Sequence, residues 1–221
     1  MNQFSVYLFD VDGTLVDSAA DICGAIQAVL AQTRQNEVSD EFLRTYIGRH
    51  LLDLFQHLLP ELTREQIDQM IADYRQIYLG RKHAQTRLYP GVADVLAQLP
   101  GKKSTATTKG TPTTRSVLEM FGLLPYFDHV QGTDGFPAKP EPDVIHASLR
   151  VFGVAPEECL FVGDSPADME AGRRAGVSTC AVLWGYGKRE QMAKWQPDYW
   201  LSEPAELLAL AANSSRLSRP V

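Results

Sequence analysis

Short apolar segments that alternate with helical segments are the feature that most restricts how this chain can fold. Runs rich in β-branched and aromatic residues lie at 5–9, 104–107, 129–131, 159–162 and 179–183. Apolar residues recur at helical spacing over 92–99, 113–121, 142–152, 168–175 and 205–212. Strands that alternate with helices are typical of βαβ units, in which the strands are parallel. The sequence therefore predicts an α/β fold built on a central parallel sheet.

The interval between the first two predicted strands is much longer than a single crossover requires. Residues 17–87 must therefore hold an insert, and its length fits an all-helical subdomain of roughly four helices. This organisation predicts a core made of residues 1–16 and 88–212, with 17–87 as a separate subdomain. The polar segment 213–221 lacks periodicity and is expected to be a disordered tail.

Two helices of the insert have recognisable signals. Ser18 followed by Asp21 resembles a capping box, which predicts a helix from Ala19 to about residue 32. Residues 65–79 carry apolar side chains on one helical face, and Gly80 follows as a C-terminal stop. The apolar stripe is expected to form the core of the insert.

Composition and charge exclude several classes of protein. The 27 acidic residues against 21 Lys and Arg give a net charge of −6, which argues against a surface that binds nucleic acid. We find neither a signal peptide nor a run of about 18 apolar residues, so no membrane association and a cytoplasmic location are expected. Cys23, Cys159 and Cys180 lack the spacing of a zinc site or a disulfide framework.

The stretch FDVDGTLVDS, residues 9–18, places Asp10 and Asp12 directly after the first predicted strand. Ligands bind at the carboxyl ends of parallel strands, but two carboxylates there repel each other unless a cation lies between them. Mg²⁺ is such a cation, because it prefers carboxylate and carbonyl oxygens. An EF-hand loop does not fit, since the acidic positions after Gly13 do not continue at its spacing. An Asx-turn pair that caps a loop is the structural alternative.

Three later segments also place polar or charged side chains at predicted strand ends or turns. FVGDSPAD, residues 161–168, is a second strand that ends in acid, with Asp164 followed by Asp168. TATTK, residues 105–109, ends a third strand with hydroxyls, and AKPEPD, residues 138–143, holds Lys139 near turn-forming prolines. With these four motifs in order, the chain resembles the phosphohydrolases of the haloacid dehalogenase superfamily over about residues 6–212.

The resemblance implies a Rossmann-like three-layer core whose first strand is central, and a helical cap inserted after the first motif. It implies that Asp10 is the nucleophile that forms an aspartyl-phosphate, and that Asp12 is the general acid and then the base. It also implies that Asp10, the Asp12 backbone carbonyl and Asp164 ligate Mg²⁺, with Asp168 completing or supporting the cluster.

The remaining expected site residues bind the phosphoryl group or the rest of the substrate. The resemblance implies that Thr107 and Lys139 hold the phosphoryl oxygens, together with amides of strand-end loops, where Gly13 and Thr108 lie. Related enzymes often have Asn at the position of Thr108, which changes the contacts available there. Arg49, after Gly48 in the insert, could pair with a second anionic group of the substrate.

Four of the expected site residues also have a purely structural interpretation. Lys139 could be a surface lysine of a proline-rich loop, and Thr107 could be only a β-branched strand residue. Asp168 could simply cap the helix that follows it. Arg49 could be a solvated arginine at a helix end.

Several reactions remain open. A dehalogenase does not need the second acid, so Asp12 argues against that activity. Two segments, 15–22 (LVDSAADI) and 46–49 (YIGR), resemble phosphoglycolate-phosphatase-like sequences. They favour a phosphatase for a small phosphorylated metabolite, with 2-phosphoglycolate as the first expected substrate. A sugar-phosphate mutase, a pyrophosphatase and another sugar-phosphate phosphatase are the alternatives.

A non-enzymatic alternative is a phosphorylated receiver domain, which also uses acids, a Thr and a Lys around Mg²⁺. Such domains have about 120 residues, carry no insert, and place the phosphorylated Asp after a later strand. Asp10 and Asp12 share one strand end here, so this alternative is disfavoured. The sequence leaves monomer and homodimer both open.

Overall fold

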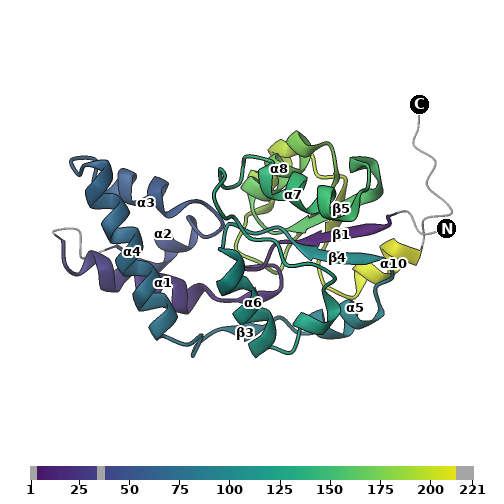
Figure 1. Cartoon of the computed structure of the whole chain (residues 1–221), viewed down its shortest axis with the longest axis horizontal. Helices are drawn as coiled ribbons and strands as arrows, with labels where there is room; N and C mark the ends of the chain where they lie inside the picture. The colour runs from purple at the N-terminus through teal and green to yellow at the C-terminus, as the bar shows by residue number, and fades with distance from the viewer. Residues whose placement is uncertain (1–3, 34–37, 213–221) are drawn as a thin grey trace.

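The computed structural model describes residues 4–33 and 38–212 of the 221-residue chain. The tail predicted over 213–221 lies outside these residues. Figure 1 shows two parts, an α/β core and a helical part beside it. No helix among the described residues combines the length and the apolar character needed to cross a membrane.

The core is built on one five-stranded sheet with the order β4-β1-β5-β6-β7, in which all paired strands are parallel. Its strands are β1 (Val6–Phe9), β4 (Lys102–Thr105), β5 (Cys159–Gly163), β6 (Ser178–Val182) and β7 (Tyr199–Leu201). The first strand lies inside the sheet, between β4 and β5. The predicted α/β class with a central parallel sheet is confirmed.

Helices cover both faces of the sheet, which gives three layers (Figure 1). Val6 and Leu8 of β1 pack with α7 (Asp143–Phe152) and α8 (Pro166–Ala175). Tyr7 and Phe9 point to the other face, because side chains alternate along a strand, and pack with α5 (Val92–Gln98), α6 (Thr111–Met120) and α10 (Glu206–Ala212). The short helix α9 (Arg189–Met192) packs through Met192 beside Ala181 of β6 and Trp200 of β7.

One predicted strand is wrong, and three short strands, β2 (Val16–Asp17), β3 (Arg87–Leu88) and β7, were not predicted. The segment 129–131 makes only a single bridge, between His129 and Ser104. The Thr105 hydroxyl accepts from the Gln131 amide at 2.8 Å and donates to the Gln131 carbonyl at 2.9 Å. These side-chain hydrogen bonds replace the main-chain hydrogen bonds of a paired strand. Strand β7 was not predicted because it has three residues, too few to show the alternation of apolar and polar side chains that indicates a strand.

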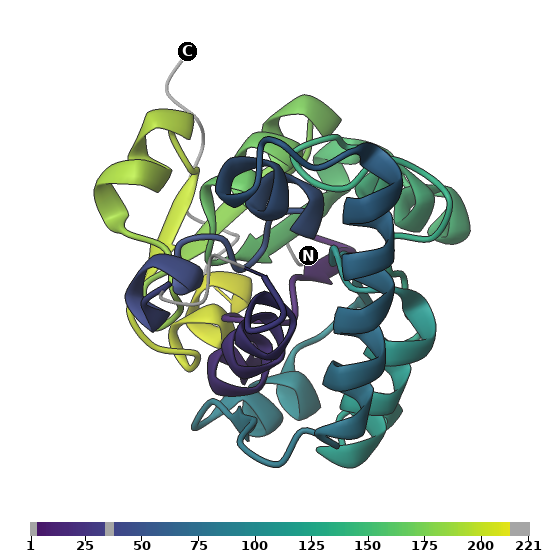
Figure 2. The same ribbon diagram turned by 90° about the vertical axis from the view of Figure 1, so that its left-hand side faces the viewer.

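The described residues of the insert, 17–33 and 38–87, form four helices with a core of their own: α1 (Ala19–Leu30), α2 (Asp40–Arg44), α3 (Leu51–Leu58) and α4 (Arg64–Gly80). In Figure 2, which faces this part, α4 runs along its front. A capping box starts α4, since the Thr63 hydroxyl accepts from the Gln66 amide and the Gln66 side chain accepts from the Thr63 amide. We call residues 17–87 the cap; this division remains a proposal, supported by the separate apolar cluster.

Two short strands, β2 (Val16–Asp17) and β3 (Arg87–Leu88), pair antiparallel where the chain enters and leaves the cap. The buried Asp21 carboxylate ties these ends together. It accepts from Arg81 Nε at 3.1 Å, from the Gln85 amide at 2.9 Å and from the Thr86 hydroxyl at 2.8 Å.

The predicted capping box at Ser18 is wrong. Ser18 makes no side-chain capping hydrogen bond, and its hydroxyl donates to Asp12 Oδ1 instead. The Tyr186 hydroxyl takes its place, because it accepts from the Ser18 and Ala19 amides at 2.7 and 3.0 Å. It also donates to Asp17 Oδ1 at 2.9 Å.

Asp21→Ala is expected to lower the free energy of unfolding by about 3 kcal/mol, because it leaves Arg81, the Gln85 amide and the Thr86 hydroxyl without their buried acceptor. Urea denaturation measures this. The control is Asp68→Ala, whose carboxylate pairs with Arg64 on the exposed face of α4 and should cost less than about 1 kcal/mol. Equal losses in the two variants would contradict the importance of the Asp21 contacts.

Candidate active site

Three buried carboxylates meet at the carboxyl edge of the sheet. Asp10 follows β1, Asp164 follows β5, and Asp168 lies in the first turn of α8. One carboxylate oxygen from each residue lies within 4.8 Å of the others. The fold therefore brings together residues that lie more than 150 positions apart in the sequence.

Lys139 joins this cluster from the loop before α7. Its ammonium donates to Asp10 Oδ1 at 2.7 Å, to Asp168 Oδ1 at 2.5 Å and to the Ala106 carbonyl at 3.0 Å. The side chain is fully buried, so the interpretation of Lys139 as a surface lysine is wrong. Burial alone would lower the pKa of Lys139, but the charges of Asp10 and Asp168 raise it, and the group stays charged.

The cluster holds more negative charge than Lys139 can balance. Burial raises the pKa of Asp10 to about 7, with Lys139 opposing this shift and Asp168 adding to it. Burial also raises the pKa of Asp164 well above its usual range, helped by the charges of Asp168 and Asp10. Asp10 Oδ2 is buried and has no hydrogen-bond partner among the described residues. A hard divalent cation such as Mg²⁺ fits this donor set, since it would neutralise the buried carboxylates.

Asp168 both caps a helix and contributes to this cluster. Its Oδ2 accepts from the Ser165 amide at 2.9 Å and hydroxyl at 2.6 Å, while the Ser165 hydroxyl accepts from the Asp168 amide. This reciprocal cap fixes the carboxylate, so its other oxygen reaches Lys139. The two interpretations of Asp168 are therefore compatible.

Tightly packed backbone holds Asp164. Gly13 has a φ of +92°, and a Cβ there would lie 2.3 Å from Asp164 Oδ2. A Cβ on Gly185 would lie 2.4 Å from the same carboxylate. The Gly13 amide donates to the Val16 carbonyl at 2.8 Å, so it is engaged in the turn rather than free to bind a phosphoryl oxygen. The structure thus gives Gly13 a packing contact with Asp164, in contrast to the substrate contact expected from the sequence.

Asp12 turns away from the three carboxylates. Its Oδ1 accepts from the Ser18 hydroxyl at 2.5 Å, and its Oδ2 lies 3.2 Å from the ammonium of Lys109. Asp12 lines a cavity with a volume of about 630 Å³. The two acids of the first motif therefore have different surroundings, Asp10 among acids and Asp12 beside a cation.

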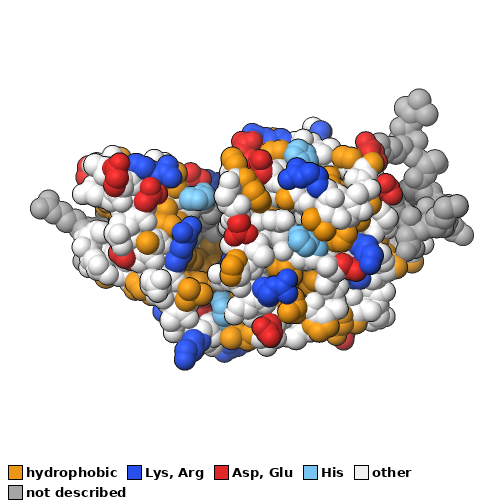
Figure 3. Space-filling model, viewed as in Figure 1, with side chains coloured by type: hydrophobic (Ala, Val, Ile, Leu, Met, Phe, Trp, Pro, Cys, Tyr) orange, Lys and Arg blue, Asp and Glu red, His pale blue; other side chains and the backbone are white. Residues whose placement is uncertain are grey.

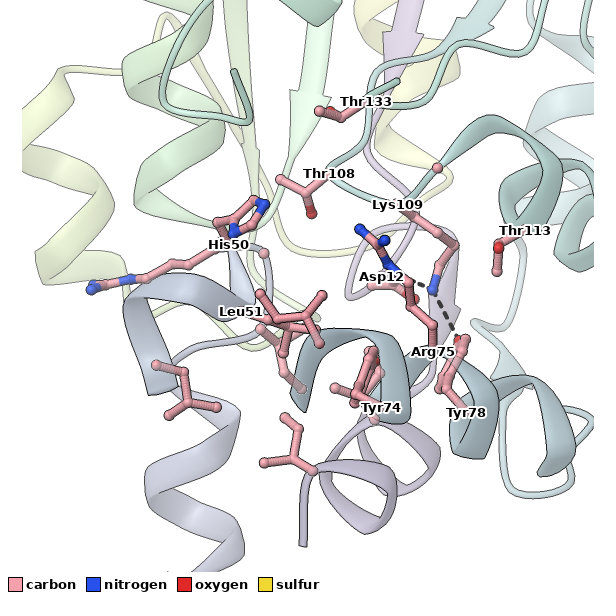
Figure 4. Close-up of a pocket in the computed structure, with 18 of the residues that line it drawn as sticks. Asp12, His50, Leu51, Tyr74, Arg75, Tyr78, Thr108, Lys109, Thr113 and Thr133 are labelled. Carbon is pink, nitrogen blue, oxygen red and sulfur yellow. Dashed lines mark hydrogen bonds and ion pairs between the residues drawn. The ribbon is translucent and has the colours of Figure 1, made fainter. Parts of the chain in front are cut away.

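The cavity lies between the cap and the core, where Figure 3 shows a hollow with basic side chains at its rim. Figure 4 shows Tyr74, Arg75 and Tyr78 of α4 on one side, with Thr108 and Lys109 of the core on the other. Residues 46–50, which include Arg49, also line it. Arg49 stacks on Tyr46 at 5.3 Å and makes no ion pair with any described residue.

Thr107 and Thr108 lie at the end of β4 in different environments. Thr107 is fully buried, and its hydroxyl accepts from the Lys109 amide at 3.3 Å, so no described residue takes the hydroxyl hydrogen. Thr108 is half-buried and lines the cavity. Sequence reasoning missed the roles of Lys109 and Arg75, although Lys109 directly follows the two threonines at a strand end, the position where side chains reach a ligand.

Comparison with known proteins agrees with this geometry. The family model described as haloacid dehalogenase-like hydrolase matches residues 7–182. A phosphoglycolate phosphatase of Aquifex aeolicus is 35% identical over 94% of this chain and 97% of its own. The pyrophosphatase PpaX of Anoxybacillus flavithermus is 32% identical, over 97% of this chain and 100% of its own.

A solved structure of a haloacid dehalogenase-like hydrolase from Streptococcus pneumoniae has a TM-score of 0.86 and 29% identity, covering 95% of this chain and 99% of its own. The chain therefore belongs to the haloacid dehalogenase-like hydrolases, and its relatives are phosphatases.

The raised pKa of Asp10 predicts how stability depends on pH in the absence of metal. The folded protein holds the Asp10 proton more tightly than the unfolded chain, whose value is near 3.8. The stability from this proton is complete below about pH 3.8 and is lost as the pH rises through about 7. Asp10→Asn mimics the neutral carboxyl. In chelator at pH 8 this variant should therefore melt several degrees above the unsubstituted protein, because each 1 kcal/mol of added stability raises the melting temperature by about 2–4 °C.

Thermal denaturation at pH 5 and pH 8 measures this effect, with Asp94→Asn, on the exposed start of α5, as the control. The gain from Asp10→Asn should shrink at pH 5. A gain of the same size at both pH values would show that ionisation of Asp10 does not destabilise the metal-free protein.

Proposed function

We propose that the protein is a Mg²⁺-dependent phosphatase that hydrolyses a small phosphorylated metabolite through an aspartyl-phosphate on Asp10. The observation that carries this proposal is the environment of Asp10. One of its oxygens is bound to Lys139 and the other is buried without a partner, beside two more acids. Such a carboxylate has an oxygen available for attack and neighbours that favour a bound cation.

Mg²⁺ would be held by Asp10, Asp164 and the backbone carbonyl of Asp12, with Asp168 supporting the cluster. The ion supplies positive charge that lets an anionic carboxylate approach an anionic phosphate. The side chain of Asp12 points to Ser18 and Lys109, which leaves its carbonyl as the group available to the ion.

The first step transfers the phosphoryl group to the protein. An oxygen of Asp10 attacks phosphorus, the bond from phosphorus to the ester oxygen breaks, and its electron pair stays on the leaving oxygen. Asp12 donates a proton to that oxygen. The Lys139 ammonium and the free hydroxyl hydrogen of Thr107 offset the charge on the phosphoryl oxygens, and this positioning is the main requirement of phosphoryl transfer.

The second step restores the protein. Asp12, now a carboxylate, takes a proton from a water molecule, and the oxygen of this water attacks phosphorus. The bond between phosphorus and Asp10 breaks, inorganic phosphate is released, and Asp10 is again a carboxylate. Both steps use the same two acids in opposite directions.

The cavity favours a substrate with a second anionic group. Arg49, Arg75 and Lys109 line it, while Asp12 already pairs with Lys109. Phosphoglycolate carries a carboxylate beside its phosphate, and pyrophosphate carries a second phosphoryl group. The names of the two similar enzymes point to these same compounds. We propose 2-phosphoglycolate as the first candidate substrate and pyrophosphate as the second.

Phosphate release from a panel that includes 2-phosphoglycolate, pyrophosphate, hexose phosphates and nucleotides tests the proposal, each with Mg²⁺ and with chelator. We expect one preferred compound, reversible loss of activity in chelator, and at least about a 10⁴-fold loss in folded Asp10→Asn, because the nucleophile is removed. Full activity in chelator or in Asp10→Asn would refute the mechanism.

Arg49 is expected to bind the second anionic group. Arg49→Gln should raise KM for 2-phosphoglycolate by roughly tenfold, the effect of losing a charged hydrogen bond, and should change KM for p-nitrophenyl phosphate much less. Arg44→Gln, which removes a charge from α2 outside this cavity, is the matched control. An equal change in KM for both substrates would show that Arg49 does not recognise the second group.

A further inference from the structure

A buried lysine connects the cap to Asp12. The Lys109 ammonium lies 3.2 Å from Asp12 Oδ2 and donates to the Tyr78 hydroxyl at 2.9 Å. Figure 4 shows both contacts, with Lys109 between the other two residues. The ammonium also lies 4.4 Å from the centre of the Tyr78 ring, and the Lys109 side chain is only 9% exposed.

The cap fixes the position of Tyr78. This residue lies near the end of α4, stacks on Tyr74 with ring centres 5.7 Å apart, and meets the edge of His83 at 5.2 Å. Lys109, in contrast, belongs to the core loop between β4 and α6. The contact between Tyr78 and Lys109 therefore exists only while the cap is docked on the core.

The Asp12 carboxylate is held by one group on each oxygen. The Ser18 hydroxyl, at the start of the cap, binds Oδ1, and Lys109 binds Oδ2. Among the described residues no other hydrogen bond or ion pair to these oxygens is found. The orientation of this carboxyl in the cavity thus depends on Lys109, whose own place depends on Tyr78.

We propose that Lys109 is a positioning residue that aims the Asp12 carboxyl at the leaving-group oxygen, and that Tyr78 makes this alignment depend on cap docking. The inference rests on the proposed function, in which Asp12 protonates the leaving oxygen. Cap docking and proton transfer are then coupled, so the ester bond breaks efficiently only in the closed cavity.

Substrates whose leaving groups differ in their need for a proton distinguish a positioning role of Lys109 from a purely structural one. When the bond from phosphorus to the ester oxygen breaks, the electron pair remains on that oxygen. An alkoxide or a simple phenolate needs the proton of Asp12, whereas p-nitrophenolate is stable as an anion. Misalignment of Asp12 should therefore slow phenyl phosphate more than p-nitrophenyl phosphate, which has nearly the same shape.

The experiment measures kcat/KM for phenyl and p-nitrophenyl phosphate, because kcat/KM covers only the steps up to departure of the leaving group. Lys109→Met should lower the ratio of the phenyl to the p-nitrophenyl value by roughly tenfold or more, within the range of general acid catalysis. Tyr78→Phe, which removes only the hydroxyl, should lower the same ratio by roughly threefold, the effect of one hydrogen bond. Lys102→Met, on the exposed start of β4, is the control.

Asp12→Asn distinguishes a failure of the positioning role of Lys109 and Tyr78 from a failure of the proposed proton transfer by Asp12. If it lowers the ratio strongly while Lys109→Met and Tyr78→Phe leave the ratio as it is, Asp12 is the acid and the positioning role is wrong. If Asp12→Asn slows both esters equally, the proton transfer in the proposed function is wrong. Equal losses on both esters in Lys109→Met and Tyr78→Phe would assign these residues to substrate binding or folding and overturn the proposal.

Discussion

The ion pair of Lys139 with Asp10 and Asp168 is the interaction on which the site depends. Three carboxylates buried within 4.8 Å of one another repel, and each has lost its hydration. Lys139 offsets part of this charge, and its third hydrogen bond, to the Ala106 carbonyl, anchors it to the end of β4. The remaining negative charge is what the proposed divalent cation would neutralise.

The two acids at the end of β1, for which we propose different tasks, have different neighbours. Asp10 faces the anionic cluster and keeps one oxygen without a partner. Asp12, two residues later, faces the cavity, where Ser18 and Lys109 hold it. The cap contributes to the surroundings of Asp12, since Ser18, which precedes its first helix, and Tyr78, which contacts Lys109, both belong to it. The cavity of about 630 Å³ between the cap and the core is partly open to solvent and has room for the small phosphate ester that we propose as substrate.

The sequence was sufficient for the fold class and for the residues of the carboxylate cluster, because βαβ alternation and acids at strand ends are local patterns. It could not reveal contacts that depend on tertiary structure. The resemblance placed Lys139 in the site, but its hydrogen bonds to Asp10, Asp168 and the Ala106 carbonyl depend on the fold, and Lys109 looked like an ordinary residue after two threonines. The Ser18 capping box was wrong for a physical reason: a serine hydroxyl can donate to a nearby carboxylate as readily as it can accept from a helix amide, and the Tyr186 hydroxyl replaced it. Residues 129–131 have strand-like composition, but the Thr105 side chain takes the place of their ladder.

The most direct test of the account is to locate the phosphoryl group on the protein during turnover. The protein is mixed with Mg²⁺ and its preferred substrate, quenched in acid within one turnover, and digested for peptide mass spectrometry. The account predicts a phosphorylated peptide with the group on Asp10, and its absence in Asp10→Asn. A phosphoryl group on another residue, or rapid phosphate release with no phosphorylated protein at any time, would contradict it.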